Sequence, residues 1–145
     1  MNHSPSKVLS TYLIAAGLFT DDRGEDWALF ISGMQDKPSK AGCLYDTAGV
    51  KDGRLMTTGE AIFHYGNQLR VRGLNYQTTR AKLQAVVNDL REVQNEEVTI
   101  GTDTYTIVAV SRTSDILFLG AEDGSKRRKV FVCNFLSTIT MEESS

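Results

Sequence analysis

The sequence predicts an α+β fold, with a mostly antiparallel β-sheet and two helices packed on one face of it. Three observations predict this fold. Two segments repeat apolar residues at helical spacing, the remaining segments read as strands, and short turns join most of those strands, which favours antiparallel pairing. The chain of 145 residues is 41% apolar and 23% charged, which is ordinary for a globular protein. We expect residues 1–145 to form a single domain.

Both helices are predicted from their amphipathic periodicity. In the first, residues 4–16, Ser4 is a suitable N-cap, Pro5 fits the first helical position and Gly17 supplies a stop. The second, residues 77–94, carries an apolar stripe with its charged residues away from the stripe. Each stripe needs an apolar surface, which the sheet would provide. The stripe of the second helix comprises Leu83, Val86, Val87, Leu90 and Val93.

Three strands are predicted before the second helix, at residues 27–31, 43–47 and 61–73. The third alternates strictly between polar and apolar residues. Such alternation indicates a sheet with one face against water or against a polar partner. The polar set is Gln68, Arg70 and Arg72, and the apolar set is Leu69 and Val71.

Residues 48–60 form the longest stretch without a regular pattern. Gly49, Gly53 and Gly59 punctuate this segment. A loop of about 12 residues inside a small domain is uncommon and is often functional. We therefore predict an exposed arm or hairpin here.

The last third predicts four strands, at residues 98–100, 104–111, 116–119 and 130–139, followed by a flexible tail at residues 140–145. Several of these strands carry apolar residues on both faces, whereas two helices cover only one face of a sheet. Either the sheet curls on itself or another subunit covers its second face, because a large exposed apolar patch is a liability for a soluble monomer. This pattern is the main indication of an oligomer.

Charge and cysteine content exclude several classes of function. With 16 basic and 18 acidic residues the net charge is −2, which argues against sequence-independent DNA binding. Cys43 and Cys133 fit no CxxC motif and read as small buried residues in a reducing compartment. No run approaches the ~20 apolar residues of a membrane span, and the polar N-terminal segment predicts no signal peptide.

We predict no catalytic residues, no cofactor and no metal ion. His64 follows a strand pattern and reads as a packing residue, while His3 lies on a polar N-terminal segment. The acidic loop at residues 20–26 lacks the spacing of a calcium loop and reads as solvated. The basic run at residues 126–129 reads as a solvated hairpin end, although it could contact phosphate. Trp27 is either a core or rim aromatic or an anchor at an interface.

Several short segments occur in a recognisable order along the chain. They are residues 26–33 (DWALFISG), 43–49 (CLYDTAG), 69–73 (LRVRG), 108–113 (VAVSRT) and 116–120 (ILFLG). In order and spacing they resemble the tail-terminator (tail completion) and minor-capsid-like proteins of long-tailed bacteriophages. The resemblance covers roughly residues 8–139, and its most suggestive element is the Tyr-Asp-Thr strand end with a glycine-rich loop after it.

The resemblance implies a structural role without enzymatic activity. It implies a homo-oligomeric ring, expected to be a hexamer, that terminates tail-tube growth and joins the tail to the head-side connector or stopper protein. The expected partners are therefore further copies of the chain, the tail-tube protein and the connector. The expected location is the neck of the virion, assembled in the host cytoplasm, with DNA passing through the lumen without specific binding and with no membrane contact.

Candidate contact residues follow from the predicted strand faces and loops. Contacts within the ring are predicted for the strand faces that carry Arg70, Arg72 and Arg112. Their candidate ionic partners are Asp46, Glu60 and Asp115. Contacts between rings are predicted for residues 48–60 and for the loop at residues 33–40. The individual candidates between rings are Met34, Lys37, Lys51, Arg54, Leu55 and Met56, with Trp27 as a possible anchor.

Three alternatives remain open at the level of sequence. A head-closure (stopper) protein or a tail-tube-like ring protein shares the same small β-rich character. A monomeric domain that binds a small ligand or a peptide would use the apolar sheet face as a pocket wall. An enzyme would need His64 to converge with an acid such as Asp46 or Glu60.

Overall fold

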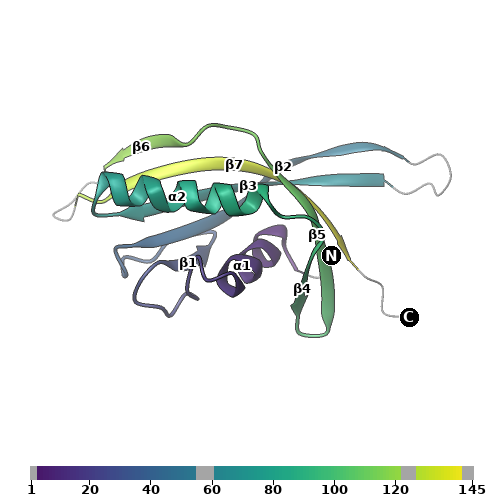
Figure 1. The fold of residues 1–145 in the computed structure, drawn as a ribbon, viewed down its shortest axis with the longest axis horizontal. Coiled ribbons are helices and arrows are strands. Elements are labelled where there is room, and N and C mark those ends of the chain that lie inside the picture. The colour runs from purple at the N-terminus through teal and green to yellow at the C-terminus, as the bar shows by residue number, and fades with distance from the viewer. Residues whose placement is uncertain (1–2, 55–60, 122–126, 142–145) are drawn as a thin grey trace.

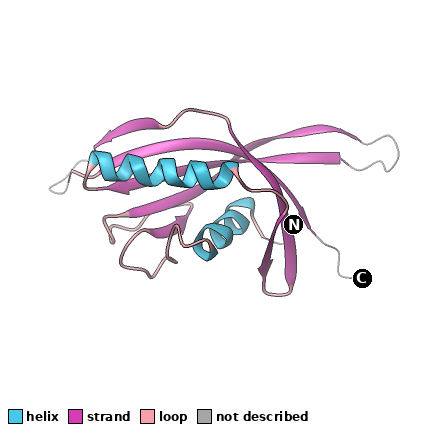
Figure 2. Cartoon of the chain, in the orientation of Figure 1, coloured by secondary structure: helices cyan, strands magenta, loops and turns pink. Residues whose placement is uncertain are grey.

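The computed structural model describes residues 3–54, 61–121 and 127–141 (Figure 1). Two helices and, in this described part of the chain, seven strands form an α+β fold, as predicted (Figure 2). The helices are α1 (Pro5–Ala15) and α2 (Tyr76–Arg91). The strands are β1 (Ala28–Ile31), β2 (Ala41–Arg54), β3 (Ala61–Gly73), β4 (Glu96–Ile100), β5 (Asp103–Arg112), β6 (Leu117–Ala121) and β7 (Lys129–Met141).

All strands belong to one sheet with the order β1-β2-β3-β7-β5-β4. Strand β7 is central: β3 pairs with one side of it, and β6 and β5 pair with successive parts of the other side. The pairings are antiparallel except for β1 and β2, which are parallel. Because parallel neighbours need a connection that returns to the starting end, residues 32–40 must cross back along the sheet.

Local sequence signals account for both helices. The Ser4 side chain accepts a hydrogen bond from the backbone N–H of Lys7, and Pro5 occupies the first turn of α1. Asn75 caps α2 in the same way, accepting from the backbone N–H of Thr78. Gly17, with a φ of 81°, ends α1 in the left-handed conformation that glycine adopts without strain.

Both helices pack on the same face of the sheet and share one core. From α1, Val8, Leu9 and Leu13 are buried against this face. The apolar stripe of α2 is buried in the same cluster, as are alternate residues of β3 and β7. Burying one such side chain stabilises the fold by roughly 1.5–3 kcal/mol, so this shared face is the main source of stability. The strand residues at its centre are Leu69, Val71, Phe131, Cys133 and Phe135.

Two predicted boundaries are wrong in a similar way, because pairing extends the strands. Strand β2 continues to Arg54 and pairs with β3 as far as Ala61. The prediction of an irregular stretch at residues 48–60 is therefore wrong for residues 48–54, which form one arm of a hairpin, the second of the two forms predicted for this segment. Residues 55–60 lie outside the described part of the chain. At the C-terminal end, Thr140 and Met141 belong to β7 and pair with β5, so they are not a loose tail. Residues 142–145 also lie outside the described part.

Both cysteines are buried, reduced strand residues, as predicted. Cys133 faces the helices, whereas Cys43 belongs to a small second cluster on the opposite face. Burial raises the pKa of both thiols, which keeps them protonated at neutral pH.

Candidate assembly surfaces

A buried arginine of β3 holds the loop of residues 32–40 against the sheet. Arg72 is 3% exposed. Its guanidinium donates to the main-chain carbonyls of Gln35 and Pro38, each at 2.7 Å. It also donates to the carbonyls of Ser39 at 3.2 Å and Asp36 at 3.4 Å. The polar face of β3, predicted to lie against water or a polar partner, is therefore covered at Arg72 by this loop, which the Arg72 side chain organises.

A second arginine ties the same loop to the start of β7. Arg128 is buried, and its guanidinium donates to a carboxylate oxygen of Asp36 at 2.8 Å and to the Asp36 main-chain carbonyl. The expectation of a solvated basic run is wrong for Arg128, since the loop covers it. Both arginines bind the loop of residues 32–40, in which Lys37 is exposed and Met34 is half-buried against the second cluster.

Asp46 and the arginines of β3 do not lie together. The Asp46 carboxylate accepts from the backbone N–H and the hydroxyl of Ser6 at 3.0 and 2.8 Å, and from the Asn67 amide at 3.3 Å. It therefore sits at the positive N-terminal end of α1, on the helix-bearing face. Arg70 lies on the opposite face, 5.2 Å from the centre of the Tyr45 ring, and its Nε–H donates to Gln68 at 2.9 Å.

The remaining single-residue candidates have local partners. Arg112 lies 3.8 Å from Asp115, and both side chains are exposed. Trp27 is half-buried at the rim of the core, just before β1. The Nζ atoms of Lys82 and Lys40 lie 5.3 and 5.7 Å from its ring centre. Burial lowers the pKa of Lys82. Of the two sequence readings of Trp27, these contacts favour the rim aromatic.

Strand β6 is an edge strand with apolar side chains on both faces. Leu117, Phe118 and Leu119 are 51%, 46% and 52% exposed. Phe118 packs edge-on against Tyr76 of α2, with ring centres 5.1 Å apart. In the described part of the chain β6 pairs only with β7, so its other backbone edge is open. An open edge with apolar flanks is a template for pairing with another chain. The contact residues predicted from the sequence do not include β6. Its run of consecutive apolar residues, which places apolar side chains on both faces, is the sequence feature that indicates an exposed contact strand.

The hairpin of β2 and β3 projects beyond the rest of the sheet (Figure 1). Its root is bent at a register shift between Thr47 and Val50, opposite Gly66. A Cβ atom at Gly66 would collide with the Ala48 carbonyl oxygen, so the close approach of the two strands requires glycine. Of the predicted contact residues, Lys51 and Arg54 lie in β2, whereas Leu55 and Met56 lie outside the described residues.

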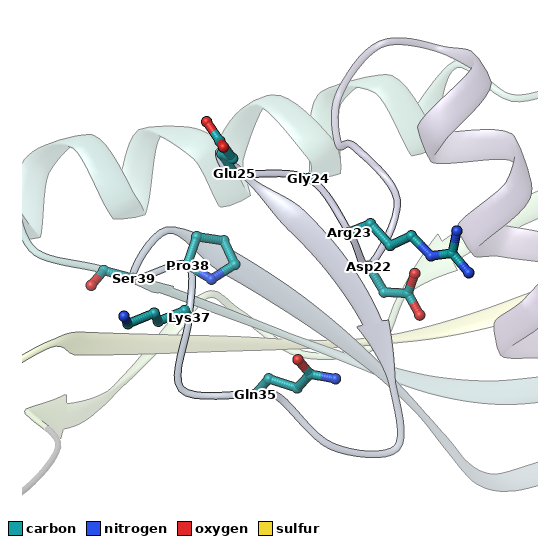
Figure 3. A pocket seen from close by; sticks show the side chains of 8 residues that line it. All are labelled: Asp22, Arg23, Gly24, Glu25, Gln35, Lys37, Pro38 and Ser39. Atoms are coloured by element: carbon teal, nitrogen blue, oxygen red, sulfur yellow. The ribbon is translucent and has the colours of Figure 1, made fainter.

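An open hollow of about 820 Å³ lies between the acidic loop and the loop of residues 32–40. Its charged side chains come from both loops and do not converge on one point (Figure 3). Within residues 3–54, 61–121 and 127–141, no group of three or more His, Cys, Asp or Glu side chains is placed to hold a metal ion. The lining residues are Asp22, Arg23, Gly24, Glu25, Gln35, Lys37, Pro38 and Ser39.

The two histidines have structural partners. His64 Nδ1 lies 2.7 Å from the hydroxyl of Thr138 on β7. His3 contacts the fully buried Tyr105, whose hydroxyl lies 2.8 Å from His3 Nδ1 and accepts from the His3 backbone N–H at 3.1 Å. The contacts of His3 connect the segment before α1 to β5. The contact of His64 with Thr138 matches the packing role predicted for His64.

No helix among the described residues is long and apolar enough to cross a membrane. No protein-family model matches the chain, and no curated protein matches its sequence. One solved structure aligns with 96% of this chain and 92% of its own length, at 11% sequence identity and a TM-score of 0.47. At that similarity the alignment does not indicate a function. Any indication of function comes from the surfaces of the chain itself.

Proposed function

We propose that this protein is a structural, non-enzymatic component of a long-tailed phage virion. In this role a ring of copies, expected to be a hexamer, terminates growth of the tail tube and joins the tail to the head-side connector or stopper protein. The ring would assemble in the host cytoplasm and reside at the neck of the virion. The observation that supports this proposal most is that the two candidate contact segments lie at opposite ends of the sheet.

A terminating ring needs two different contact faces, one for the tube and one for the connector. The loop of residues 32–40 lies where β2 begins, and the projecting hairpin lies where β2 ends. Strand β2 runs for fourteen residues from the loop at Ala41 to Arg54, the last described residue of this hairpin arm, and at about 3.3 Å per residue this is over 40 Å. The loop of residues 32–40 is held by Arg72 and Arg128. The hairpin of β2 and β3 extends past the point where β3 stops pairing with β7. A rigid loop at one end and a projecting hairpin at the other suit contacts with two different neighbours.

The exposed apolar edge at β6 supports contacts between copies within the ring. A closed ring needs a heterologous contact, in which two different patches of the subunit meet. An apolar edge strand provides one of these patches, and its burial would remove an aggregation liability. The net charge of −2 also suits a lumen that DNA crosses without being held, because tight phosphate contacts would hinder its passage.

Light scattering after size exclusion, across a concentration series, tests the proposal, with negative-stain imaging of any large species. We expect a ring of about six copies with a central hole, formed alone or on addition of tail tubes, since weak rings assemble on their partner. A protein that stays monomeric at all concentrations and on tail tubes would contradict the proposal and favour a monomeric binding domain. Capping of connectors without capping of tubes would instead assign the stopper role.

A matched pair of variants tests whether β6 contributes to the ring. Leu117→Lys places a charge on the exposed edge strand, and Ala85→Lys places the same charge on the exposed side of α2. We expect Leu117→Lys to abolish rings while leaving thermal stability unchanged, because the side chain is already half in water. Ala85→Lys should leave rings intact. Equal ring yields for both variants would exclude β6 from the contact.

A further inference from the structure

A second hollow, of about 390 Å³, lies on the face of the sheet that carries no helix. Strands β3 and β7 form its floor, and β2, β6 and the loop of residues 32–40 form its walls. Most of its lining is apolar, and among the described residues arginine supplies its only charge. A hollow of this size, with a few polar groups among apolar ones, is the usual form of a small-ligand site. The lining residues are Met34, Tyr45, Arg70, Arg72, Leu119, Gly120, Ala121 and Val130.

Two contacts hold the Arg70 side chain in place within this hollow. Its guanidinium lies 5.2 Å from the centre of the Tyr45 ring, and its Nε–H donates to Gln68 at 2.9 Å. The Gln68 amide in turn donates to Asn134 of β7 at 3.1 Å, and the Asn134 amide donates to the Ser114 hydroxyl at 3.3 Å. This chain of hydrogen bonds orients the guanidinium before any ligand arrives, which lowers the entropy cost of binding.

The terminal N–H groups of Arg70 are the unused donors of the hollow. Among the described residues they have neither a hydrogen-bond acceptor nor a carboxylate within ion-pair distance. Every fully buried side-chain nitrogen or oxygen in the described part of the chain has a hydrogen-bond partner, so these N–H groups must reach solvent. Arg72 lines the same hollow, but its guanidinium is bound to carbonyls of the loop of residues 32–40. Arg70 therefore supplies the donors that a ligand would meet.

The chemistry of the hollow matches a carboxylate that is carried on a short apolar group. A guanidinium presents paired N–H groups that fit the oxygens of a carboxylate. Close to it, the side chains of Met34, Leu119 and Val130 offer apolar surface that a hydrocarbon of a few carbon atoms would cover. Because Arg70 is half-buried, the pair would form in a partly dehydrated site, where such a hydrogen bond is stronger than in water.

We propose that this hollow binds a small free acid, whose carboxylate pairs with Arg70 and whose short apolar group packs between the loop of residues 32–40 and β6. The site lies within one copy of the chain, so it depends neither on ring formation nor on a role in a phage tail. Glu122 and Asp123 follow Ala121 in the sequence, outside the described residues. The test must therefore distinguish these acids from an added one.

Titration of the full chain with hexanoate, hexanamide and acetate tests the site, followed by NMR of labelled methionine and leucine methyl groups. We expect hexanoate to shift the Met34 and Leu119 resonances and to bind about tenfold more tightly than hexanamide, the ratio that one charge-assisted pair provides. Acetate lacks the apolar chain and should bind about tenfold more weakly than hexanoate. Arg70→Gln should remove the preference for hexanoate over hexanamide. Arg91→Gln, at an exposed arginine at the end of α2, should preserve it.

Equal binding of hexanoate and hexanamide, or a preference that survives Arg70→Gln, would overturn the proposal. Binding that appears only in the chain carrying Glu122→Gln and Asp123→Asn would also overturn it, because the hollow would then belong to the chain's own acids. A blocked Leu-Glu-Leu peptide that binds more tightly than hexanoate would assign the hollow to a protein partner instead. The comparison of the probes on the wild-type chain decides the matter even if Arg70→Gln does not fold.

Discussion

Arg70 and Arg72 lie two residues apart on the same face of β3, yet their surroundings differ. Arg72 is 3% exposed and donates to main-chain carbonyls of the loop at residues 32–40, whereas Arg70 is half-exposed above Tyr45. Removing a buried donor leaves carbonyl oxygens without their partners, which costs more than the net strength of the hydrogen bonds. The same chemical change should therefore have different effects at the two positions.

We predict that Arg72→Met lowers the free energy of unfolding by about 3 kcal/mol, because the loop loses the donor that organises it. Arg70→Met should lower it by less than about 1 kcal/mol, since this side chain is half in solvent. Urea unfolding followed by circular dichroism measures both values. Equal losses in the two variants would show that Arg72 does not organise the loop.

Tyr12 links the two helices and gives the fold a sensitivity to alkaline pH. Its hydroxyl donates to the Asp89 carboxylate at 2.6 Å. Burial, followed by the hydrogen bond and charge of Asp89, raises the Tyr12 pKa above its ordinary value of 10.0. Because the folded state favours the neutral phenol, this contribution to stability is complete below pH 10.0 and is lost as the pH rises through the folded-state pKa.

We predict that wild-type protein loses stability above about pH 10 more steeply than Tyr12→Phe, which cannot ionise. The stability difference between the two proteins should be largest near neutral pH and should shrink as the pH rises. Urea midpoints measured between about pH 7 and pH 11 test this, and Tyr76→Phe, at an exposed position, is the control. A difference that grows with pH would refute the linkage.

The residue partners of the two buried arginines could not be read from the sequence. Arg72 and Arg128 bind main-chain carbonyls and one carboxylate of a loop that lies 33 to 92 positions away. Carbonyl acceptors exist at every position, so no side-chain pattern marks them. His64 and the cysteines were predictable, because their strand positions alone fix their surroundings.

At the scale of elements, periodicity located both helices and most strands. Gly49 and Gly53 obscured the length of β2, because a glycine weakens the local strand signal while pairing with β3 overrides it. The parallel pairing of β1 with β2 had no local signal either, since it depends on how residues 32–40 cross the sheet. The apolar side chains on both faces of β6 could be predicted from the sequence. Its position as an edge strand that pairs only with β7 among the described residues could not.

The projecting hairpin should be dispensable for folding. Beyond His64 it has no third strand among the described residues, since pairing of β3 with β7 stops there. We predict that replacing residues 52–62 with Asn-Gly, between the paired Lys51 and Phe63, leaves the melting temperature within a few degrees. Attachment of tails should be lost, as scored by virion assembly. The control replaces Gly101 and Thr102 of the β4–β5 turn with Asn-Gly.

Normal virions assembled with the shortened hairpin would remove it from the proposed contacts between rings. A large fall in melting temperature would instead show that the hairpin stabilises the subunit itself. In that case, lost attachment would no longer report on contact surfaces. The two measurements therefore separate a folding role from an assembly role.

At the scale of the molecule, the fold divides its tasks between two faces. One face carries both helices and the single large core, so it supplies stability. The other face carries the arginine-held loop, the small second cluster and an open hollow lined by Arg70 and Leu119. Charge and composition alone could not assign these faces, because both contain arginine-bearing strands.

The shared core predicts that the whole chain unfolds as one unit. Buried residues of α1, α2 and strands on both sides of β7 belong to the same cluster, so neither helix can leave without exposing the apolar surface of the other. Trp27, the single tryptophan, lies at the rim beside α2 and reports on the region between the helices. Its fluorescence and far-UV circular dichroism should therefore give coincident urea transitions. The measurement belongs at two protein concentrations, since self-association would shift both midpoints together. A fluorescence transition that precedes the loss of helix would show that the region around α1 unfolds independently and that residues 1–145 are not one cooperative domain.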